Sequence, residues 1–381
     1  MANTITNLIP ILYTAMDVVS RELVGFIPAV TRDSSAETAA KDETINIPIV
    51  PAITAADITP AVTAPDNGDA TIGNTTMTIS KSRYAPVRWN GEEQKAVNNT
   101  NIYQNVNTQR FTQAMRTLVN EVETDLAALY VHASRAYGTA ATAPFGTAGD
   151  LSDVAQMRKI LEDNGAPQSD LQLVLGSAAV ANMRGKQNTL FKLNEAGTDA
   201  MLRQGAIGDI EGFQIHNSGQ VKAHTKGTGA SYTSDTAGYA IGATAITLIT
   251  GTGTILAGDV VTFAGDTNKY IVKTALTGGV VTLQEPGLKI ALAASAVALT
   301  VGGTSTENMA FSRSAITLVT RAPAMPDGGD SADDVLTVSD PVSGLAFQIA
   351  MYRQYRQVRF EVGLAWGVKV IAPRHVGILL G

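Results

Sequence analysis

The chain contains no cysteine, so neither disulfide bonds nor thiolate metal ligands can hold it together. Charged residues are scarce as well: they make up 16% of the 381 residues, against about a quarter in an ordinary soluble domain. The net charge of −6 argues against tight, general binding of phosphate by the whole chain. A surface with so little charge is poorly suited to a freely diffusing monomer. We therefore expect much of it to be covered by other subunits.

Histidine is the third scarce residue type. The chain has four, and two of them, His216 and His224, lie close together beside a run of glycines. A two-histidine metal or catalytic site needs a third ligand and supporting groups at a definable spacing, and the neighbouring sequence offers none. From Gly219 onward the pattern has the composition of a loop, which favours a boundary between two folded units. We predict no catalytic, metal-binding or cofactor-binding residues.

Known catalytic signatures are also missing, since the sequence has no G-x-S-x-G, H-E-x-x-H or Walker pattern. The G-x-G at 251–258 opens no helix, so hairpin turns explain it better than a phosphate site. The four carboxylates of DGGDSADD at 327–334 leave a bound cation or a solvated loop as alternatives. Arg353, Arg356 and Arg359 could meet carboxylates of another subunit or nucleic acid, although an ordinary charged sheet face is the simpler interpretation.

No long apolar run predicts a membrane span or an export signal. The first 23 residues lack a basic region, and Pro10 and Asp17 interrupt them well short of a spanning length. Their apolar residues recur instead at helical spacing, as on an amphipathic arm: Leu12, Met16, Val19 and Leu23. The expectation is a soluble intracellular product.

Residues 44–92 are predicted to form an extended β-hairpin. Ile45, Ile47 and Ile49 alternate at the period of a strand, and Asn67–Gly68 is a strong hairpin-turn signal. Prolines and a shortage of charge give this ribbon too little core to be stable alone in water. We expect it to lie on a neighbouring copy of the chain. The alternative is an ordinary surface hairpin of the same chain.

Periodicity divides the rest of the chain into helical and β-rich parts. Residues 105–137 are predicted to form one long helix of roughly 50 Å, followed by an α/β segment over 150–221. Short strands separated by glycines over 222–307 predict a small all-β barrel or sandwich. We interpret this unit as an insertion, because the pattern of the preceding α/β segment resumes at Asn308. Strict alternation over 358–370 predicts a strand, which a turn near one of its glycines could divide.

Taken in this order, the parts resemble a tailed-bacteriophage major capsid protein of the HK97-like fold. The stretches that carry the resemblance are IGDIEGFQIHNS, FSRSAITLVTRAP and WGVKVIAPRHVGIL, together with the arm, the long hairpin and the spine-like helix. The β-rich insertion after Gln220 is similar to the inserted domain of the P22-like coat protein branch. The resemblance covers nearly the whole chain, and its motifs are structural segments rather than catalytic signatures.

The resemblance implies an α+β fold of five regions. These would be an N-terminal arm over 1–43, an extended loop over 44–92, a peripheral domain over 93–149 and 324–357 with the spine helix at 105–137, an axial domain and core sheet over 150–221, 308–323 and 358–381, and an inserted β-barrel domain over 222–307. The polar segment 222–238 would be the best positional candidate for a contact between capsomers.

The function implied is that of a structural, non-enzymatic major capsid protein. It would assemble with itself as hexamers and pentamers into an icosahedral shell around double-stranded DNA, which it would contact non-specifically. A scaffolding protein and a portal would be its partners, with no cofactor and no membrane. It would reside in the virion capsid after assembly in the cytoplasm of the bacterial host.

Three alternatives remain open from the sequence. An encapsulin-type nanocompartment shell would share the fold but bind a cargo peptide. A β-rich adhesin or carbohydrate-binding protein would use the Gly/Thr-rich β unit and stay monomeric. An enzyme would lose an activity when His216 or His224 is changed to alanine. Electron microscopy of the expressed protein separates these alternatives most directly.

Overall fold

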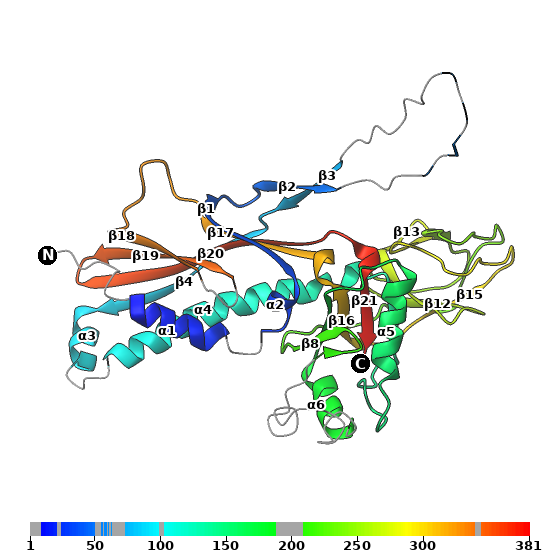
Figure 1. The fold of residues 1–381 in the computed structure, drawn as a ribbon, viewed down its shortest axis with the longest axis horizontal. Helices are drawn as coiled ribbons and strands as arrows, with labels where there is room; N and C mark the ends of the chain where they lie inside the picture. The colour runs from blue at the N-terminus through cyan, green and yellow to red at the C-terminus, as the bar shows by residue number, and fades with distance from the viewer. Residues whose placement is uncertain are drawn as a thin grey trace.

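The structure is a computed structural model that describes residues 9–20, 24–49, 73–98, 103–187, 209–339 and 344–381, with single positions at 55, 57, 58, 60 and 62. It confirms the predicted α+β class. The molecule is elongated: a sheet lying on a long helix forms one end, a second α/β unit follows, and a small β unit forms the other end (Figure 1). A two-stranded ribbon leads away from the body.

Six strands form the first sheet, and its central strand is the alternating segment near the C-terminus. The strands are β1 (Thr31–Ala39), β4 (Lys81–Asn90), β17 (Ile316–Pro323), β18 (Asp334–Ser339), β19 (Ala346–Gln354) and β20 (Gln357–Val370). One edge of β20 pairs with β4 along its length, and the other edge is shared by β19 and then β17. β1 runs parallel to β17 and β18 pairs with β19, so these two strands lie on the side of β20 that faces away from β4.

The turn considered within residues 358–370 is absent, because β20 is a single strand of 14 residues. Its apolar members Phe360, Val362, Leu364 and Trp366 are buried on one face, as the alternation predicted. Gly367 has a separate reason to be glycine. A Cβ at this position would lie 2.2 Å from the carbonyl oxygen of Thr78, so the close approach of the neighbouring chain excludes any side chain.

Replacing Gly367 with alanine should therefore destabilise the protein. The contact is with backbone, which cannot rotate away, so we expect the free energy of unfolding to fall by about 1–3 kcal/mol. Urea denaturation measures this loss. Gly219 is the matched control, because it also lacks a positive φ but has nothing within 4 Å of its added Cβ, so its alanine variant should be as stable as the parent. A Gly367→Ala protein as stable as the parent would contradict the close approach.

Helices cover one face of the first sheet. They are α1 (Ile9–Ser20), α2 (Phe26–Ala29), α3 (Gly91–Asn98) and α4 (Tyr103–Ala127). The long helix α4 packs its apolar stripe on β20, where the rings of Phe111 and Phe360 meet edge to face at 5.5 Å. Leu12 and Met16 of α1 are buried in the same core, which confirms the amphipathic arm for these residues. None of the helices within the described ranges is long and apolar enough to cross a membrane.

The predicted helix over 105–137 is too long at its C-terminal end. The α-helix ends at Ala127, the turn η2 (Ala128–His132) is a 3-10 helix, and β5 (Arg135–Tyr137) is a strand. Ala133 and Ala136 continue the helical spacing, but β5 lies between β21 and β13 and is buried around Arg135. Strand pairing with distant parts of the chain overrides the local period there.

The second α/β unit is built on a sheet of the order β5–β21–β16–β6–β8–β7. Its remaining elements are β6 (Leu171–Leu175), β7 (Asp209–Ile210), β8 (Phe213–Asn217), β16 (Ser305–Ser312), β21 (Val376–Leu380), α5 (Ser152–Asp163) and α6 (Ser177–Lys186), with short 3-10 turns η4 (Arg313–Ala315) and η5 (Pro373–His375). The α/β segment predicted over 150–221 is confirmed by the amphipathic helix α5 and the fully buried strand β6. The N–H of Ser152 donates to Asp150.

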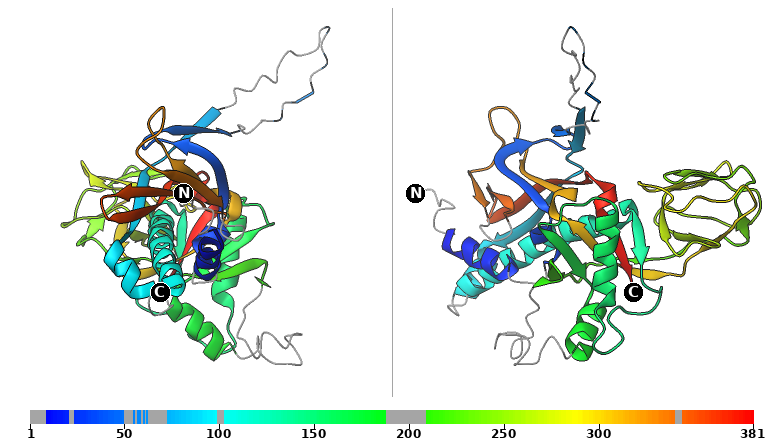
Figure 2. Two further views of the ribbon diagram at one scale, coloured as in Figure 1. Left: turned by 90° about the vertical axis from the view of Figure 1, so that its left-hand side faces the viewer. Right: turned by 45° about the vertical axis from the view of Figure 1, so that its right-hand side comes forward.

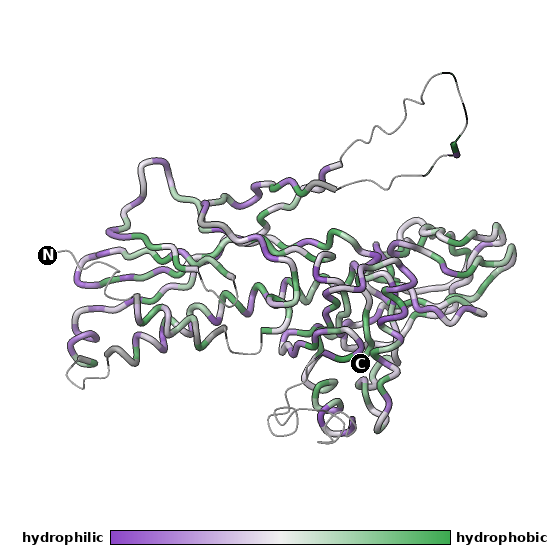
Figure 3. The backbone as a smooth tube through the Cα atoms, in the orientation of Figure 1, coloured by the Kyte–Doolittle hydropathy of each residue, from purple (hydrophilic) through white to green (hydrophobic). Residues whose placement is uncertain are grey.

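The β unit between these elements has its own apolar core and stands apart from the first sheet (Figures 2 and 3). Its strands are β10 (Tyr232–Thr233), β11 (Ala245–Thr247), β12 (Val260–Phe263), β13 (Lys269–Thr277), β14 (Val280–Leu283) and β15 (Ala298–Val301). Pairing runs β10–β15–β12–β13–β14–β11, and the bridge Ser234–Leu248 returns it to β10. The strands therefore close into a small barrel-like circuit, one of the two forms predicted.

Strand pairing crosses the region boundaries predicted from the sequence, and the five regions stay a prediction. β1 lies within the predicted arm over 1–43 and β4 within the predicted extended loop over 44–92, and both strands pair into the first sheet. The segments 308–323 and 358–381 are each divided, because β17 and β20 lie in the first sheet whereas β16 and β21 lie in the second. Sequence periodicity locates strands but not their pairing partners, which are set by contacts far along the chain.

Candidate functional site

The ribbon is formed by β2 (Thr44–Ile49) and β3 (Gly73–Thr78), which pair only with each other. This confirms a hairpin here, with Ile49 opposite Gly73 as the last described pair. Asn67–Gly68 lies outside the described residues. At the base of the ribbon, the backbone N–H of Asp42 donates to the carbonyl of Ile79 at 2.9 Å and so joins the two limbs. Lys369 Nζ of β20 donates to the carbonyl of Thr76, and this bond fastens the ribbon to the first sheet.

Burial fades along the ribbon away from this base. Met77 and Ile79 are buried in a small cluster with Ala39, Val319 and Ala365, against which Ile45 and Ile47 pack partly. Farther out, Gly73 and Asn74 are exposed. Beyond the paired strands, Ile58 and Val62 are fully exposed at 98% and 107%. Two large apolar side chains are thus exposed, and no described residue of this chain covers them.

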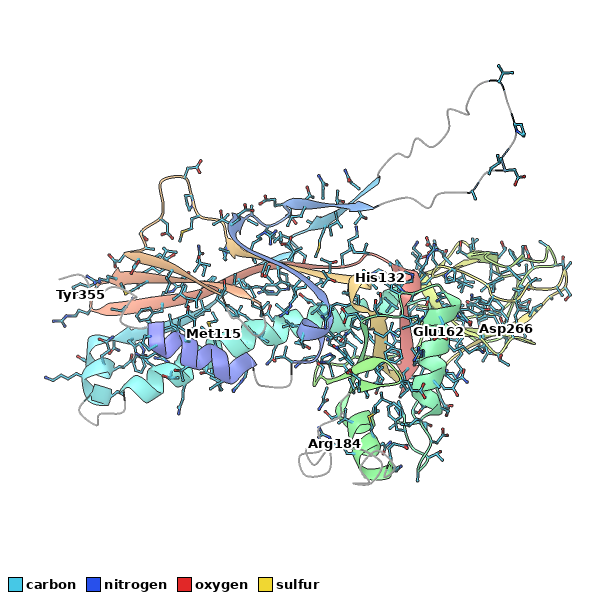
Figure 4. All side chains as sticks on the ribbon, in the orientation of Figure 1. Met115, His132, Glu162, Arg184, Asp266 and Tyr355 are labelled. Atoms are coloured by element: carbon cyan, nitrogen blue, oxygen red, sulfur yellow. The ribbon has the colours of Figure 1, made fainter. Side chains whose placement is uncertain are left out.

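A cleft of about 660 Å³ lies at the far end of the first sheet, between α3 and the turn joining β19 to β20. Trp89 and Val358 form part of its wall, and Arg353 and Arg356 lie at its margin. Tyr355 at this turn is 89% exposed and projects from the end of the molecule (Figure 4). Among the described residues that line the cleft, Glu92 is the carboxylate and none is a histidine.

The two histidines singled out in the sequence lie in different places. His216 is on β8, where its Nε2 is 2.8 Å from Gln172 Oε1, and burial lowers its pKa below the ordinary value, with Arg313 adding to this. His224 is on β9 (Ala223–His224), which pairs with the start of β16. No group of three potential metal ligands occurs in the described ranges. The boundary interpretation is confirmed, because β9 and β16 are where the chain enters and leaves the β unit.

His224 sits in a buried polar cluster at that boundary. Its Nε2 is 2.8 Å from Asp259 Oδ1 and its Nδ1 is 2.8 Å from the hydroxyl of Tyr130. Glu307, the next acidic group, is 1% exposed, and burial raises its pKa to about 7 against the opposing effects of the Ser305 hydrogen bond and His224. The pKa of Tyr130 is raised by burial and by the charges of Glu307 and Asp259.

Two aspartates of the acidic loop and two of the three arginines have partners within the chain, and Arg356 lies over the ring of Tyr355. Tyr352 donates to Asp330 at 2.6 Å, which together with burial raises the pKa of Tyr352 to about 12. Arg353 lies 3.8 Å from Asp333. Arg359 pairs with Glu361 across 2.5 Å. These contacts favour the solvated loop and the charged sheet face over the bound cation and the nucleic-acid site.

Sequence analysis missed the most buried carboxylate of the body. Glu123 of α4 is 1% exposed and accepts hydrogen bonds from the backbone N–H groups of Phe26 and Ile27 and from the hydroxyl of Ser218. Burial raises its pKa, and these hydrogen bonds oppose the rise. In the sequence Glu123 lies between Val122 and Thr124 on an ordinary helix, so no local pattern distinguishes it from the partly exposed carboxylates Glu121 and Asp125.

No protein-family model matches the chain, and no curated protein matches it. Among solved structures it is similar to the capsid of the cyanophage P-SCSP1u, with 11% identity, a TM-score of 0.49, and 92% of this chain and 86% of that one covered. A structure from Mycobacterium phage Che8 has 14% identity, a TM-score of 0.46, and coverages of 89% and 85%.

The virus-like particle from Pyrococcus furiosus is similar over 97% of each chain, with 9% identity and a TM-score of 0.42. The P22-like branch is not named among these structures and stays a prediction.

Proposed function

We propose that this chain is the structural, non-enzymatic major capsid protein of a tailed double-stranded DNA bacteriophage, assembling as hexamers and pentamers into an icosahedral shell. The observation that carries the proposal is the ribbon β2–β3, which leaves the body (Figure 1), together with the exposed apolar side chains of Ile58 and Val62. A two-stranded ribbon has too little core to be stable alone in water. Another copy of the chain is the surface that would cover it.

Symmetry makes such a contact sufficient for a large assembly. A contact of this kind joins different surfaces of two identical chains, so each copy both gives a ribbon and receives one. Closed symmetry then multiplies a modest contact over every subunit. The low content of charged residues supports the same proposal, because a surface that is largely covered by neighbours needs less charge for solubility.

The partners and location follow from the resemblance as further parts of the proposal. A scaffolding protein would guide assembly, a portal would occupy one vertex, and packaged DNA would touch the inner surface without sequence preference. The shell would assemble in the cytoplasm of the bacterial host and become the virion capsid. The segment 222–238 would contact a neighbouring capsomer.

Electron microscopy of the expressed chain, alone and with a scaffolding partner, tests the proposal. We expect closed particles of uniform diameter with hexameric and pentameric units. Mass photometry on the same samples gives the fraction assembled. Particles that enclose a protein cargo through a bound peptide would replace the phage capsid by a nanocompartment shell. A chain that stays a single copy under every condition would refute both.

A further inference from the structure

The β unit meets the body at a buried polar cluster whose members come from both sides. Tyr130 of η2 and Glu307 of β16 belong to the body, and Asp259 precedes β12 in the β unit. His224 lies between them on the entering strand, with both ring nitrogens engaged at 2.8 Å. We call these four residues and Ser305 the junction cluster.

The hydrogen bonds of His224 connect the two sides directly. In the neutral imidazole, Nε2–H donates to Asp259 and Nδ1 accepts from the hydroxyl of Tyr130. Asp259 is itself fully buried and is held by the backbone N–H groups of Gly227 at 3.0 Å and Leu256 at 2.7 Å. The carboxylate of Asp259 is therefore well satisfied, and the bridge is fixed on the side of the β unit.

Glu307 is the weak member of the cluster. Its Oε1 accepts a short hydrogen bond from the hydroxyl of Ser305, but its Oε2 is buried without a hydrogen-bond partner. The ionisable groups whose charges act together with that of Glu307 are His224 of β9 and Tyr130 of η2. Neither is a lysine or an arginine, so an ionised Glu307 would be a buried anion with one oxygen unpaired.

Glu307 also occupies the strands that join the two parts. Its backbone N–H donates to the carbonyl of Lys222 at 2.8 Å, and its neighbours Ser305 and Thr306 pair with His224 and Ala223. Ionisation of Glu307 therefore affects both β9, on which the chain enters the β unit, and β16, on which it leaves. We propose that the junction cluster is a proton-sensitive clasp, closed while Glu307 carries a proton and loosened when Glu307 ionises.

The sign and size of the effect follow from linkage. A carboxyl whose pKa is raised on folding stabilises the closed form below its ordinary value, and that stabilisation is lost as pH rises through the raised value. With a pKa of about 7 when closed and 4.5 when open, the opening equilibrium rises about tenfold between pH 6 and pH 8. Loosening is thus expected on the alkaline side of neutrality.

Hydrogen exchange of the full-length chain tests the clasp. Peptides covering 222–227 and 303–308 should lose about tenfold in protection between pH 6 and pH 8, after correction for intrinsic exchange, whereas peptides within β12 and β13 should not. The variant Glu307→Gln keeps the size of the side chain but cannot ionise, and it should abolish the change. Glu285→Gln is the matched control, since Glu285 pairs with Arg374 across the same boundary but is exposed.

A second variant keeps the test decisive if Glu307→Gln does not fold. The hydrogen bond from Ser305 lowers the pKa of Glu307, so Ser305→Ala should move the loss of protection to higher pH. The clasp is refuted if the parent protein shows no such loss, if Glu307→Gln keeps it, or if Ser305→Ala leaves its midpoint in place. The proposal stands or falls without reference to shell assembly, because every readout is local to the junction.

Discussion

Shortening the ribbon should abolish particle formation while leaving the rest of the fold intact. Ile49 and Gly73 face each other across the ribbon, so residues 50–72 can be replaced by Asn-Gly, which closes a two-residue hairpin turn. The base of the ribbon, including Met77 and Ile79, stays buried in its cluster. We expect no closed particles by electron microscopy, and a melting temperature within a few degrees of that of the parent monomer.

Point variants separate the apolar contact from the mere length of the ribbon. Changing Ile58 and Val62 together to serine removes only the exposed apolar groups and should also prevent assembly, because their burial against a neighbour would be lost. Asp57→Asn is the matched control in the same exposed segment, and particles should still form. Normal particles from the shortened chain would show that the ribbon is an ordinary surface hairpin.

Replacing Glu123 with alanine should give the largest loss of stability among single substitutions in the body. The carboxylate of α4 joins α2 and the loop after β8 by accepting three hydrogen bonds, of 3.1 Å from the N–H of Phe26, 2.8 Å from the N–H of Ile27 and 2.9 Å from the hydroxyl of Ser218. Its removal leaves these buried donors without an acceptor and opens a cavity. We expect a loss of about 3–5 kcal/mol in the free energy of unfolding, measured by urea denaturation.

Glu162→Ala is the matched control for this loss. Glu162 is also a helical glutamate, but it is exposed and pairs with Arg158 one turn away on α5. Such exposed pairs contribute about 0.3–0.5 kcal/mol. Limited proteolysis adds a local readout, since the segment around Phe26 should become cleavable in Glu123→Ala and remain protected in Glu162→Ala. Equal stability of the two variants would show that Glu123 does not fasten the N-terminal segment.

The local sequence pattern predicted the secondary structure of segments that bury one face, because the spacing of the buried residues sets the period. The alternation that ends in Val370 predicts a strand, the spacing of Phe111 and Leu118 predicts a helix, and the isoleucines of β2 predict a ribbon. Glycine-rich punctuation predicted the β unit. In each of these places propensity, burial and period agree.

The same signals misplaced the end of the long helix and the partners of the strands. Ala133 and Ala136 continue a helical spacing, yet β5 is held by β13 and β21, which lie more than a hundred residues away. β1 carries polar residues and gave no strand signal, but it completes an edge beside β17. Pairing of this kind depends on which edges meet in space, and no window of sequence contains that information.

By itself, the sequence determined the absence of disulfides and known catalytic signatures, the order of arm, ribbon, helix and β unit, and the shortage of surface charge. Only the tertiary structure decided that β4 leaves the ribbon for the first sheet, and that His224, Asp259 and Glu307 meet at one junction. This division between sequence and tertiary structure has one physical reason. Period and composition record which face of a segment is buried, whereas contacts between segments arise only when the chain closes on itself.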